Sequence, residues 1–480
     1  MQSIDPLRTF RKWSRRWQLR ALDRLDPRVI ESLSARRVVR RFREVVRDVP
    51  FYSEMLATRG VRADEIQDLE GFLSRCPVLG KSDLFGTVPI HQLCVKGRIG
   101  QPAGVLTSSG QGGRFAFGLS SRGQLSRSQA AIELGLQHAF QTDDRETLLI
   151  NALPMGVRFS CSTVTVAETS VREDMVAALV GEFGPYYEQV VLVLDPLFAK
   201  RLVDHVRDCR LDWSARRVHA ILGEETFGEC FRSYFARRLG QDPTNWTRGF
   251  IGSSMGVAEL GLNLFFETRE TVPLRQLAQS MSGDLRTGLG DWAGGVPPML
   301  FVYDPRRIFV EILDPDERGF GDLLVSTLDP AQPLPLLRYR TGDRARRVDP
   351  EVLGVALRDA GSADLQLPRL PMIAVAGRRD EQLTGGRTLL DLKDVLYADD
   401  WVADRVTGAF RVQNQGLGCR IDVQLRAGCS GDAEQMGARL QTMLAGPGVG
   451  REDEVKVYPA EQFPWRPSLD YERKFSYAAA

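Results

Sequence analysis

Residues 334–343 read LPLLRYRTGD, and this stretch decides the fold. Residues 336–340 are predicted to form a short strand, and the Thr-Gly pair that follows is predicted to end it in a turn. This places Asp343 at the end of a strand, the position at which open α/β sheets bind ligands. A carboxylate accepts two hydrogen bonds at once, so Asp343 is suited to a vicinal diol such as that of a ribose. The alternative is a surface aspartate that caps the next element.

Length and composition exclude several classes of protein. A chain of 480 residues is too long for one ordinary core, so two or more domains are expected. The net charge of +1 provides no general attraction for nucleic acid, and no apolar run approaches the roughly 20 residues of a membrane span. The cysteines are scattered without a CxxC pair and the histidines lack metal-ligand spacing, which favours free thiols in a reducing cytoplasm.

The first 50 residues are rich in arginine and are predicted to begin with a helix. Phe10, Trp13 and Trp17 recur at helical intervals. A basic amphipathic pattern of this kind is typical of helices that lie on a membrane surface. Acidic residues further along dilute the charge, which favours an ordinary helical segment packed on the main domain.

The middle of the chain alternates between two periodicities. Buried-strand candidates lie at 146–154, 189–196 and 217–225, and amphipathic-helix candidates lie at 124–140 and 196–211. This alternation predicts an α/β fold whose sheet is mostly parallel and covered by helices. After about residue 380, three strand candidates and one helix candidate predict a small α+β module.

A glycine-rich loop, TSSGQGGR, occupies residues 107–114. Glycines permit the positive φ angles with which backbone N–H groups wrap a phosphate, and hydroxyl groups add donors. The candidate phosphate-binding residues are Thr107, Ser108, Ser109, Gly110, Gly112 and Gly113. The loop lacks the Gly-Lys-Ser/Thr ending of a Walker P-loop. A glycine-rich turn between two strands is the alternative.

Three further charged residues are considered for metal binding or catalysis. Glu259 follows the stretch FIGSSMG, and a carboxylate near a phosphate loop is a plausible partner of Mg²⁺, although a helix-start glutamate fits the same pattern. Lysine is rare in this arginine-rich chain, so Lys474 near the C-terminus is a candidate catalytic cation; the alternative is a surface charge in a frayed tail. Lys81 shares this rarity, but we expect it to have a structural role.

Several of these motifs resemble those of the adenylate-forming superfamily. YRTGD at 339–343 resembles its ribose-binding motif, and the longer stretch 321–343 is most similar to the phenylacetate–CoA ligase branch. The loop at 107–113 resembles the SSGTTG phosphate loop, with Gln-Gly where Thr-Thr is usual. MGVAE at 255–259 resembles YGxxE, and GRRDEQ at 377–382 resembles the hinge motif GRxDDQ.

The resemblance implies roles for individual residues. Gly223 and Glu224 would lie beside the adenine, and Met255 and Gly256 would flank it. Asp343 would bind the ribose, and Arg378 would bind the ribose or a phosphate. Asp380 would be the hinge. Glu259 would bind Mg²⁺, and Glu259 and Lys474 would take part in catalysis.

The resemblance also implies a domain division and an activity. Residues 1–379 would form the adenylate-forming domain, and 380–480 a small mobile lid. The chain would use ATP and Mg²⁺ to activate a carboxylic acid, aromatic or biosynthetic, as an acyl-adenylate, releasing pyrophosphate. The acyl group would then pass to a thiol, most simply coenzyme A. The alternatives are transfer to an amine, a carrier protein or another nucleophile, and a non-catalytic nucleotide-binding protein.

Overall fold

The computed structural model describes the chain from residue 6 to residue 478, apart from a set of short segments. Those segments are 23, 25, 109, 111–112, 155, 159, 281–287, 290–291, 293–294, 417, 446–452 and 466–474. The predictions for Ser109, Gly112 and Lys474 fall on them and so lie outside the described residues.

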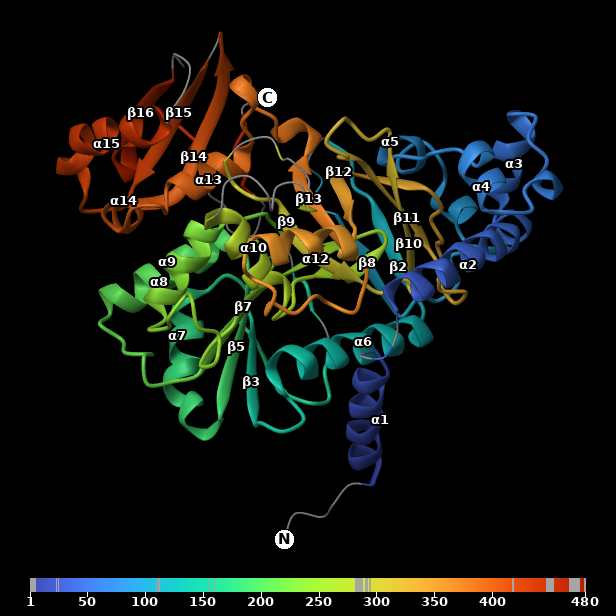
Figure 1. Ribbon diagram of the computed structural model, residues 1–480, viewed down its shortest axis with the longest axis horizontal. Helices are drawn as coiled ribbons and strands as arrows, with labels where there is room; N and C mark the ends of the chain where they lie inside the picture. Colours follow the sequence, from blue (N-terminus) through green and yellow to red (C-terminus); the bar gives the residue numbers. More distant parts are fainter. Residues whose placement is uncertain are drawn as a thin grey trace.

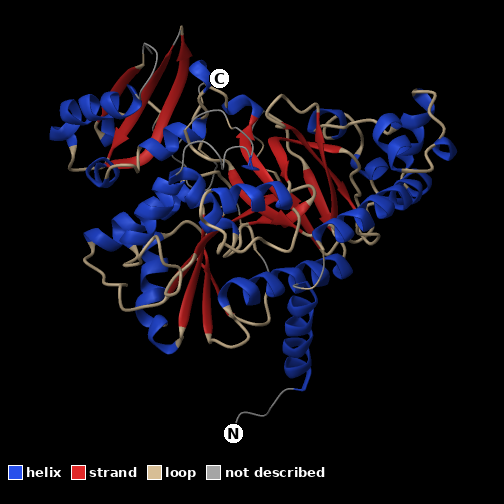
Figure 2. Cartoon of the chain, viewed as in Figure 1, coloured by secondary structure: helices blue, strands red, loops and turns tan. Residues whose placement is uncertain are grey.

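Helices surround a large central sheet (Figures 1 and 2). The strands of this sheet are β3 (Thr147–Asn151), β4 (Thr165–Glu168), β5 (Gln189–Leu194), β6 (Val218–Leu222), β7 (Ile251–Val257), β8 (Gly261–Phe266), β9 (Met299–Tyr303), β10 (Ile308–Leu313), β11 (Gly321–Thr327), β12 (Tyr339–Val348) and β13 (Met372–Arg378). The helices are α1 (Pro6–Leu22), α2 (Pro27–Asp48), α3 (Pro50–Thr58), α4 (Leu69–Arg75), α5 (Lys81–Leu84), α6 (Arg122–Phe140), α7 (Glu173–Glu182), α8 (Pro196–Asp208), α9 (Glu229–Arg238), α10 (Thr271–Ser280), α12 (Pro350–Asp359), α13 (Leu389–Val395), α14 (Asp400–Arg405) and α15 (Ala433–Ala445).

The 11-stranded sheet has two halves that differ in direction. Its order is β10-β11-β12-β13-β9-β8-β7-β6-β5-β3-β4. From β4 to β7 the neighbours are parallel, and from β7 to β10 they are antiparallel. The parallel strands β3 and β5 are buried along their whole length, as expected where helices cover both faces. The predicted α/β class with a helix-covered sheet is confirmed, but the sheet is mixed rather than mostly parallel, because its pairings from β7 to β10 are antiparallel.

The helices begin where the sequence supplies a cap. Ser121 accepts a hydrogen bond from the backbone N–H of Gln124 at the start of α6. Asp195 does the same for Phe198 at the start of α8, where proline occupies the first turn. These caps satisfy N–H groups that have no partner inside the helix and fix where α6 and α8 begin.

Strand β12 corrects the first prediction. The predicted strand at 336–340 begins only at Tyr339, and the Thr-Gly pair does not end it, because the strand continues to Val348. Gly342 instead adopts φ +91°, and the register with β11 shifts at this point. A β-bulge therefore takes the place of the terminal turn, and Asp343 projects from within the strand. A bulge re-aims side chains without ending the backbone ladder.

A separate two-stranded hairpin carries the glycine-rich loop. Strands β1 (Gly104–Thr107) and β2 (Phe117–Ser120) are antiparallel, so the loop does connect two strands. A Cβ atom added to Gly118 would lie 2.2 Å from the carbonyl oxygen of Ala258. Only glycine permits so close an approach. The hairpin is thereby held against the segment that carries Glu259.

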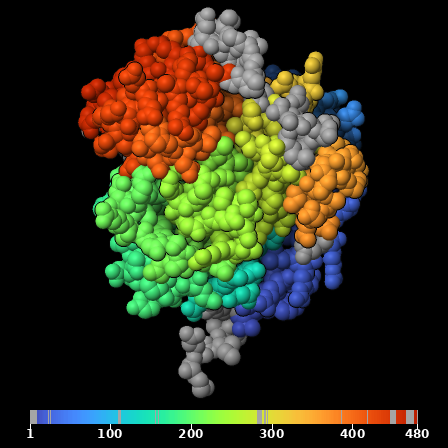
Figure 3. Space-filling view, turned by 60° about the vertical axis from the view of Figure 1, so that its left-hand side comes forward, coloured from blue at the N-terminus to red at the C-terminus, as the bar shows by residue number. Residues whose placement is uncertain are grey.

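The C-terminal part of the chain forms its own sheet. Strands β14 (Val406–Gln415), β15 (Gly418–Leu425) and β16 (Glu454–Tyr458) are arranged in that order, and α15 packs on β16. This confirms a smaller α+β unit beside the large sheet. In the space-filling view the unit lies directly on residues from the middle of the chain (Figure 3).

Ion pairs line that contact. Asp404 pairs with Arg238 at 2.6 Å and with Arg207 at 2.9 Å. Asp400 pairs with Arg237 at 2.6 Å. The carboxylates come from α14 and the guanidinium groups from α8 and α9. The C-terminal unit is therefore held on the large sheet domain by polar contacts as well as by the shared core.

The N-terminal helix α1 is attached to the body by its basic side chains. Lys12 Nζ donates to the carbonyl oxygen of Asp143 at 2.5 Å. The Arg15 guanidinium contacts Asp143 at 2.5 Å and Glu133 at 3.1 Å. Glu133 lies on α6 and Asp143 in the turn that follows it. The cationic side of α1 therefore faces the protein.

The aromatic side of α1 faces solvent. Phe10, Trp13 and Trp17 have exposed fractions of 63%, 62% and 60%. The helix is present and packs on the main domain as predicted. It does so through the basic side chains that contact α6 and the turn after it, which leaves these three aromatic residues in solvent. None of the helices that the structure describes is long and apolar enough to cross a bilayer.

Candidate active site

A cavity of about 1560 Å³ opens between the two halves of the large sheet and the C-terminal unit. Most of the described residues that are predicted from the sequence to bind ligand line this cavity. Thr107, Ser108, Gly223, Glu224, Met255, Gly256, Glu259, Asp343, Arg378 and Asp380 all line it. Gly110 and Gly113 belong to the loop at its edge and have φ angles of +72° and +81°, as a phosphate-wrapping loop requires.

Asp343 and Arg378 are brought together by strand pairing. They are register partners of the antiparallel strands β12 and β13, although 34 positions separate them in the chain. Gly342 lies beside the same guanidinium, because a Cβ added there would be 3.7 Å from it. A carboxylate and a guanidinium on one wall provide an acceptor for hydroxyl groups and a donor for phosphate oxygens.

Glu259 is a buried carboxylate, in the turn between β7 and β8 rather than at a helix start. The Tyr339 hydroxyl donates a hydrogen bond to its Oε1. Burial and the adjacent carboxylate raise the pKa of Tyr339, so the phenol stays protonated as a donor. The helix-start alternative for Glu259 is therefore excluded.

Lys81 is the site residue that sequence reasoning missed. It opens α5 and lines the cavity, and its Nζ lies 3.1 Å from Ser108 Oγ. Burial lowers the pKa of Lys81, while the nearby Glu259 carboxylate opposes that shift. The only available signal was the scarcity of lysine, because Lys81 and the glycine-rich loop are joined only by the tertiary fold. Its position at the cavity wall makes Lys81 a candidate for binding or catalysis in addition to a structural role.

Ser108 is fixed by three contacts at the base of the loop. Its N–H donates to the carbonyl oxygen of Ala116 at 2.9 Å, and its Oγ accepts from the Ala116 N–H at 2.9 Å. The third contact is the ammonium group of Lys81. The loop thus enters the cavity with one hydroxyl already positioned and a cation beside it.

The parallel half contributes the turn after β6. Gly223 follows the strand directly, and Glu224 adopts φ +69°, an uncommon angle for a residue with a side chain. Glu225 is anchored by Lys393 of α13, whose Nζ lies 2.7 Å from its Oε2. The turn therefore joins the large sheet to the C-terminal unit at the edge of the cavity.

Part of the cavity wall is apolar. Its residues come mostly from α6 and from strands of the large sheet. The apolar residues that line it include Ile132, Leu136, Ala139, Phe140, Val193, Ile221, Phe250, Phe266 and Phe301. Such a surface favours the hydrocarbon or ring portion of a ligand, whose burial is worth roughly 25 cal/mol per Å².

The C-terminal tail reaches the cavity. Residues 475–478 line it, and the Tyr477 carbonyl oxygen accepts a hydrogen bond from the Val412 N–H at 2.8 Å. Phe475 and Tyr477 are buried, with ring centroids 4.8 Å apart. Two aromatic anchors therefore hold the tail at the cavity directly after Lys474 in the sequence.

The carboxylates that line the cavity could contact a magnesium ion that arrives with a nucleotide. Within the described residues there is no group of three or more His, Cys, Asp or Glu side chains that could hold a metal. Mg²⁺ bound with a nucleotide usually takes one or two carboxylates, its other ligands being phosphates and water. Glu259 offers one carboxylate, of which Tyr339 engages Oε1.

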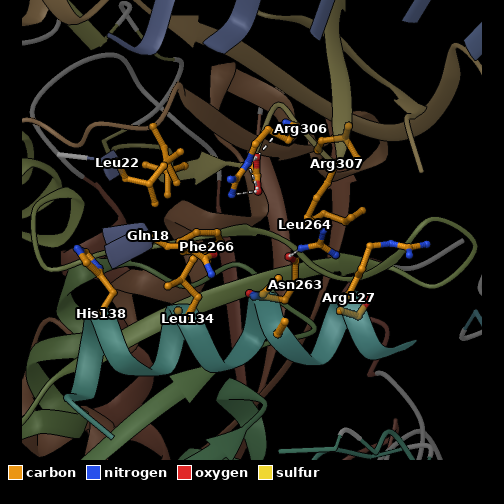
Figure 4. A pocket seen from close by; sticks show the side chains of 18 of the residues that line it. Gln18, Leu22, Arg127, Leu134, His138, Asn263, Leu264, Phe266, Arg306 and Arg307 are labelled. Atoms are coloured by element: carbon orange, nitrogen blue, oxygen red, sulfur yellow. Dashed lines mark hydrogen bonds and ion pairs between the residues drawn. The ribbon is translucent and has the colours of Figure 1, made fainter. Parts of the chain in front are cut away.

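A second cavity of about 1040 Å³ lies on a neighbouring face of α6 (Figure 4). Two of its arginines form ion pairs within the protein: Arg127 contacts Asp329 at 2.6 Å and Arg306 contacts Asp304 at 2.8 Å. The two cavities share Gly135 of α6 in their walls. Because the second cavity contains none of the predicted site residues, the first is the candidate active site.

Comparison with known proteins supports the architecture. No protein-family model matches the chain, and neither does any curated protein. A 2-hydroxyisobutyryl-CoA ligase in the postadenylation state, in complex with 2-HIB-AMP, matches with a TM-score of 0.65 at 13% identity over 94% of this chain and 89% of that one.

The same ligase has been solved in other states. Its open conformation with 2-HIB-AMP and CoA matches with a TM-score of 0.54 at 14% identity over 94% of this chain and 91% of that one. In the thioesterification state the TM-score is 0.53 at 14% identity, covering 94% and 89%. The agreement is thus better with the postadenylation state, and the chain has the fold of the adenylate-forming ligases.

Proposed function

We propose that this protein activates a carboxylic acid with ATP, forming an acyl-adenylate and pyrophosphate, and then transfers the acyl group to a thiol. The observation that carries the proposal is the convergence of Asp343, Arg378, Glu259 and the glycine-rich loop on one cavity. These groups come from distant parts of the chain, and a purely structural core requires none of them at a solvent-accessible wall.

The adenylation step joins two anions. The acid's carboxylate attacks the α-phosphorus, a new C–O–P linkage forms, and the bond to pyrophosphate breaks. Asp343 would hold the ribose hydroxyls, and Arg378 would contact the ribose or a phosphate. Lys81 and Lys474 would reduce the repulsion between the reactants and the charge that grows in the transition state. Glu259 would hold Mg²⁺, which supplies positive charge beside the phosphates when bound.

The acid is expected to have a neutral, apolar body. The support is that Phe140, Phe250, Phe266 and Phe301 are among the residues that line the cavity. An aromatic acid fits this lining and accords with the resemblance to the phenylacetate–CoA ligase branch. Within that class, coenzyme A is the acceptor we favour, because the solved ligase of the same fold was captured with CoA.

Two successive steps at one cavity require a movable part. We place the boundary after residue 379, so that 1–379 form the adenylating domain and 380–480 the lid, with Asp380 as the pivot. Support comes from the end of β13 at Arg378, after which residues 379–381 form a short 3-10 turn that contains Asp380. Rotation would break the ion pairs of Asp404 with α8 and α9, which are polar and therefore reversible.

The direct test is acid-dependent exchange of pyrophosphate into ATP over a panel of carboxylic acids. Aromatic acids should support exchange, and adding coenzyme A should yield the thioester and AMP. Supplying an amine or a carrier-protein thiol in place of coenzyme A identifies the acceptor. If no acid in the panel supports exchange while ATP binds, the protein is a nucleotide-binding homologue without turnover, and the proposal fails.

A further inference from the structure

The orientation of α1 is opposite to that of most surface helices. Phe10, Trp13 and Trp17 recur at intervals of three and four residues and so share one face. All three are more than half exposed, and the rings of Phe10 and Trp13 stack with centroids 6.3 Å apart. Three adjoining large aromatic side chains in water are costly, and such patches usually mark interaction surfaces.

The attachment of α1 explains why this face stays outward. Arg15 is buried between Glu133 and Asp143, and Lys12 and Arg16 both pair with Asp144. Breaking a buried pair leaves an unpaired charge, so rotating the helix to bury its aromatic residues is opposed. The aromatic face is therefore a fixed feature of the protein surface. Figure 1 shows α1 projecting from the body, at the end away from the C-terminal sheet.

The charge of α1 restricts what can cover that face. The helix sequence PLRTFRKWSRRWQLRAL contains basic residues and no acidic one. Arg11 and Arg20, near the aromatic residues in sequence, are exposed. Anionic surfaces attract such a helix, whereas a second copy would bring like charges together. Trp is also the residue best suited to a membrane interface, because it has a polar edge and a large apolar body.

We propose that α1 docks the protein on an anionic lipid surface. Phe10, Trp13 and Trp17 would enter the boundary between headgroups and acyl chains, and Arg11 and Arg20 would contact lipid phosphates. The helix lies in the interface and does not cross it, in keeping with its length and charge.

Vesicle flotation of the full chain tests the proposal. Phosphatidylcholine vesicles are compared with vesicles containing about a third phosphatidylglycerol. The wild type should float with the anionic vesicles only. Replacement of both Trp13 and Trp17 by serine should lower the partition coefficient about tenfold or more. Raising NaCl from about 0.1 M to about 1 M shortens the Debye length from about 10 Å to about 3 Å and should weaken binding as well.

Two controls make the result specific. Tyr186→Ser removes an exposed aromatic residue elsewhere, with an exposed fraction of 77%, and should float like the wild type. Arg11→Gln with Arg20→Gln should abolish the preference for anionic lipid. Thermal unfolding of each variant should match the wild type, because the side chains replaced are exposed.

Four outcomes would overturn the proposal. The wild type fails to float with either vesicle, it floats equally with both, or the double tryptophan variant floats as well as the wild type. The fourth is a dimer in sedimentation velocity that the Trp13 and Trp17 replacements dissociate while no vesicle binding occurs. That result would assign the face to a second copy, and absence of both flotation and dimer would assign it to another protein.

Discussion

The Tyr339 hydroxyl donates a hydrogen bond to the Glu259 carboxylate, which joins the first residue of YRTGD to the last residue of MGVAE. Tyr339 begins β12 and Glu259 lies in the turn before β8, so strands from different parts of the sheet meet here. The contact fixes one oxygen of a buried carboxylate at the wall of the cavity, beside Lys81 and the glycine-rich loop.

Glu259→Gln should raise the Mg²⁺ requirement of the adenylation reaction. An amide oxygen can still accept from Tyr339, so the fold is retained, but the charge that a hard cation prefers is lost. The Mg²⁺ concentration for half-maximal pyrophosphate exchange should rise about tenfold or more. Glu351→Gln, which removes a surface carboxylate paired with Arg28, is the matched control. Superimposable Mg²⁺ titrations for Glu259→Gln and the wild type would remove Glu259 from the site.

Asp343→Ala should weaken the use of ATP without unfolding the protein. A hydrogen bond to a charged group is worth roughly 1.5–3 kcal/mol, so loss of one or two bonds to the ribose should raise the KM for ATP tenfold to a few hundredfold or more. Asp329→Ala removes a carboxylate of the second cavity and should leave this KM unchanged. An unaltered KM in a well-folded Asp343→Ala variant would show that this carboxylate does not hold the nucleotide.

Lys81→Met should slow adenylation and leave acyl transfer intact. The side chain keeps most of its length but loses the charge that contacts Ser108 and neighbours Glu259. We expect pyrophosphate exchange to fall about a hundredfold, as on loss of one electrostatic stabiliser. Conversion of a synthetic acyl-adenylate should continue. Lys96→Met replaces an exposed lysine and serves as the control. Equal loss in both half-reactions would indicate a structural role.

Lys474→Ala should abolish most adenylate formation, by roughly a hundred- to a thousandfold. An ammonium group on a flexible stem can reach the acid and the α-phosphate together. The variant should still convert a synthetic acyl-adenylate and acceptor to product. Arg473→Ala is the adjacent, equally charged control. If that control loses activity while Lys474→Ala does not, the tail motif is aligned one residue too far along.

Asp195→Asn should change the pH dependence of stability. Burial, with smaller contributions from Glu225 and Glu224, raises the pKa of Asp195 from 3.8 to about 7. The folded protein therefore binds a proton that the unfolded chain releases at lower pH, and stability falls as pH rises from about 4 to about 7. An asparagine at position 195 cannot ionise, so this loss of stability with pH is removed. Its side-chain oxygen can still accept the hydrogen bond from the Phe198 N–H that caps α8.

At about pH 8 the Asp195→Asn variant should have a free energy of unfolding up to about 4 kcal/mol higher than that of the wild type. The difference should vanish near pH 4. Urea unfolding at the two pH values measures it. Asp68→Asn, at an exposed cap of α4, distinguishes the loss of a cap from the loss of a buried charge. A variant that is less stable than the wild type at both pH values would show that the cap outweighs the charge.

Local sequence determined the elements and the motifs. The helix period at 124–140 and the apolar runs of β3, β5 and β6 predict the α/β architecture, because periodicity reports which side of an element is buried. The C-terminal α+β unit follows from the same signals. The motifs at 107–114, 255–259 and 339–343 also indicate a common site, since each carries chemistry that a core does not require.

Tertiary structure alone decided how those elements are used. The sequence around Gly342 does not show that this residue forms a β-bulge and that β12 continues past it. A glycine with positive φ is equally compatible with a turn and with a bulge. Lys81 reaches the cavity only because α5 packs beside the glycine-rich hairpin. The outward face of α1 depends on Glu133 and Asp143, which lie more than a hundred residues away in the chain. Their carboxylates pair with Arg15, and the Asp143 carbonyl oxygen accepts a hydrogen bond from Lys12.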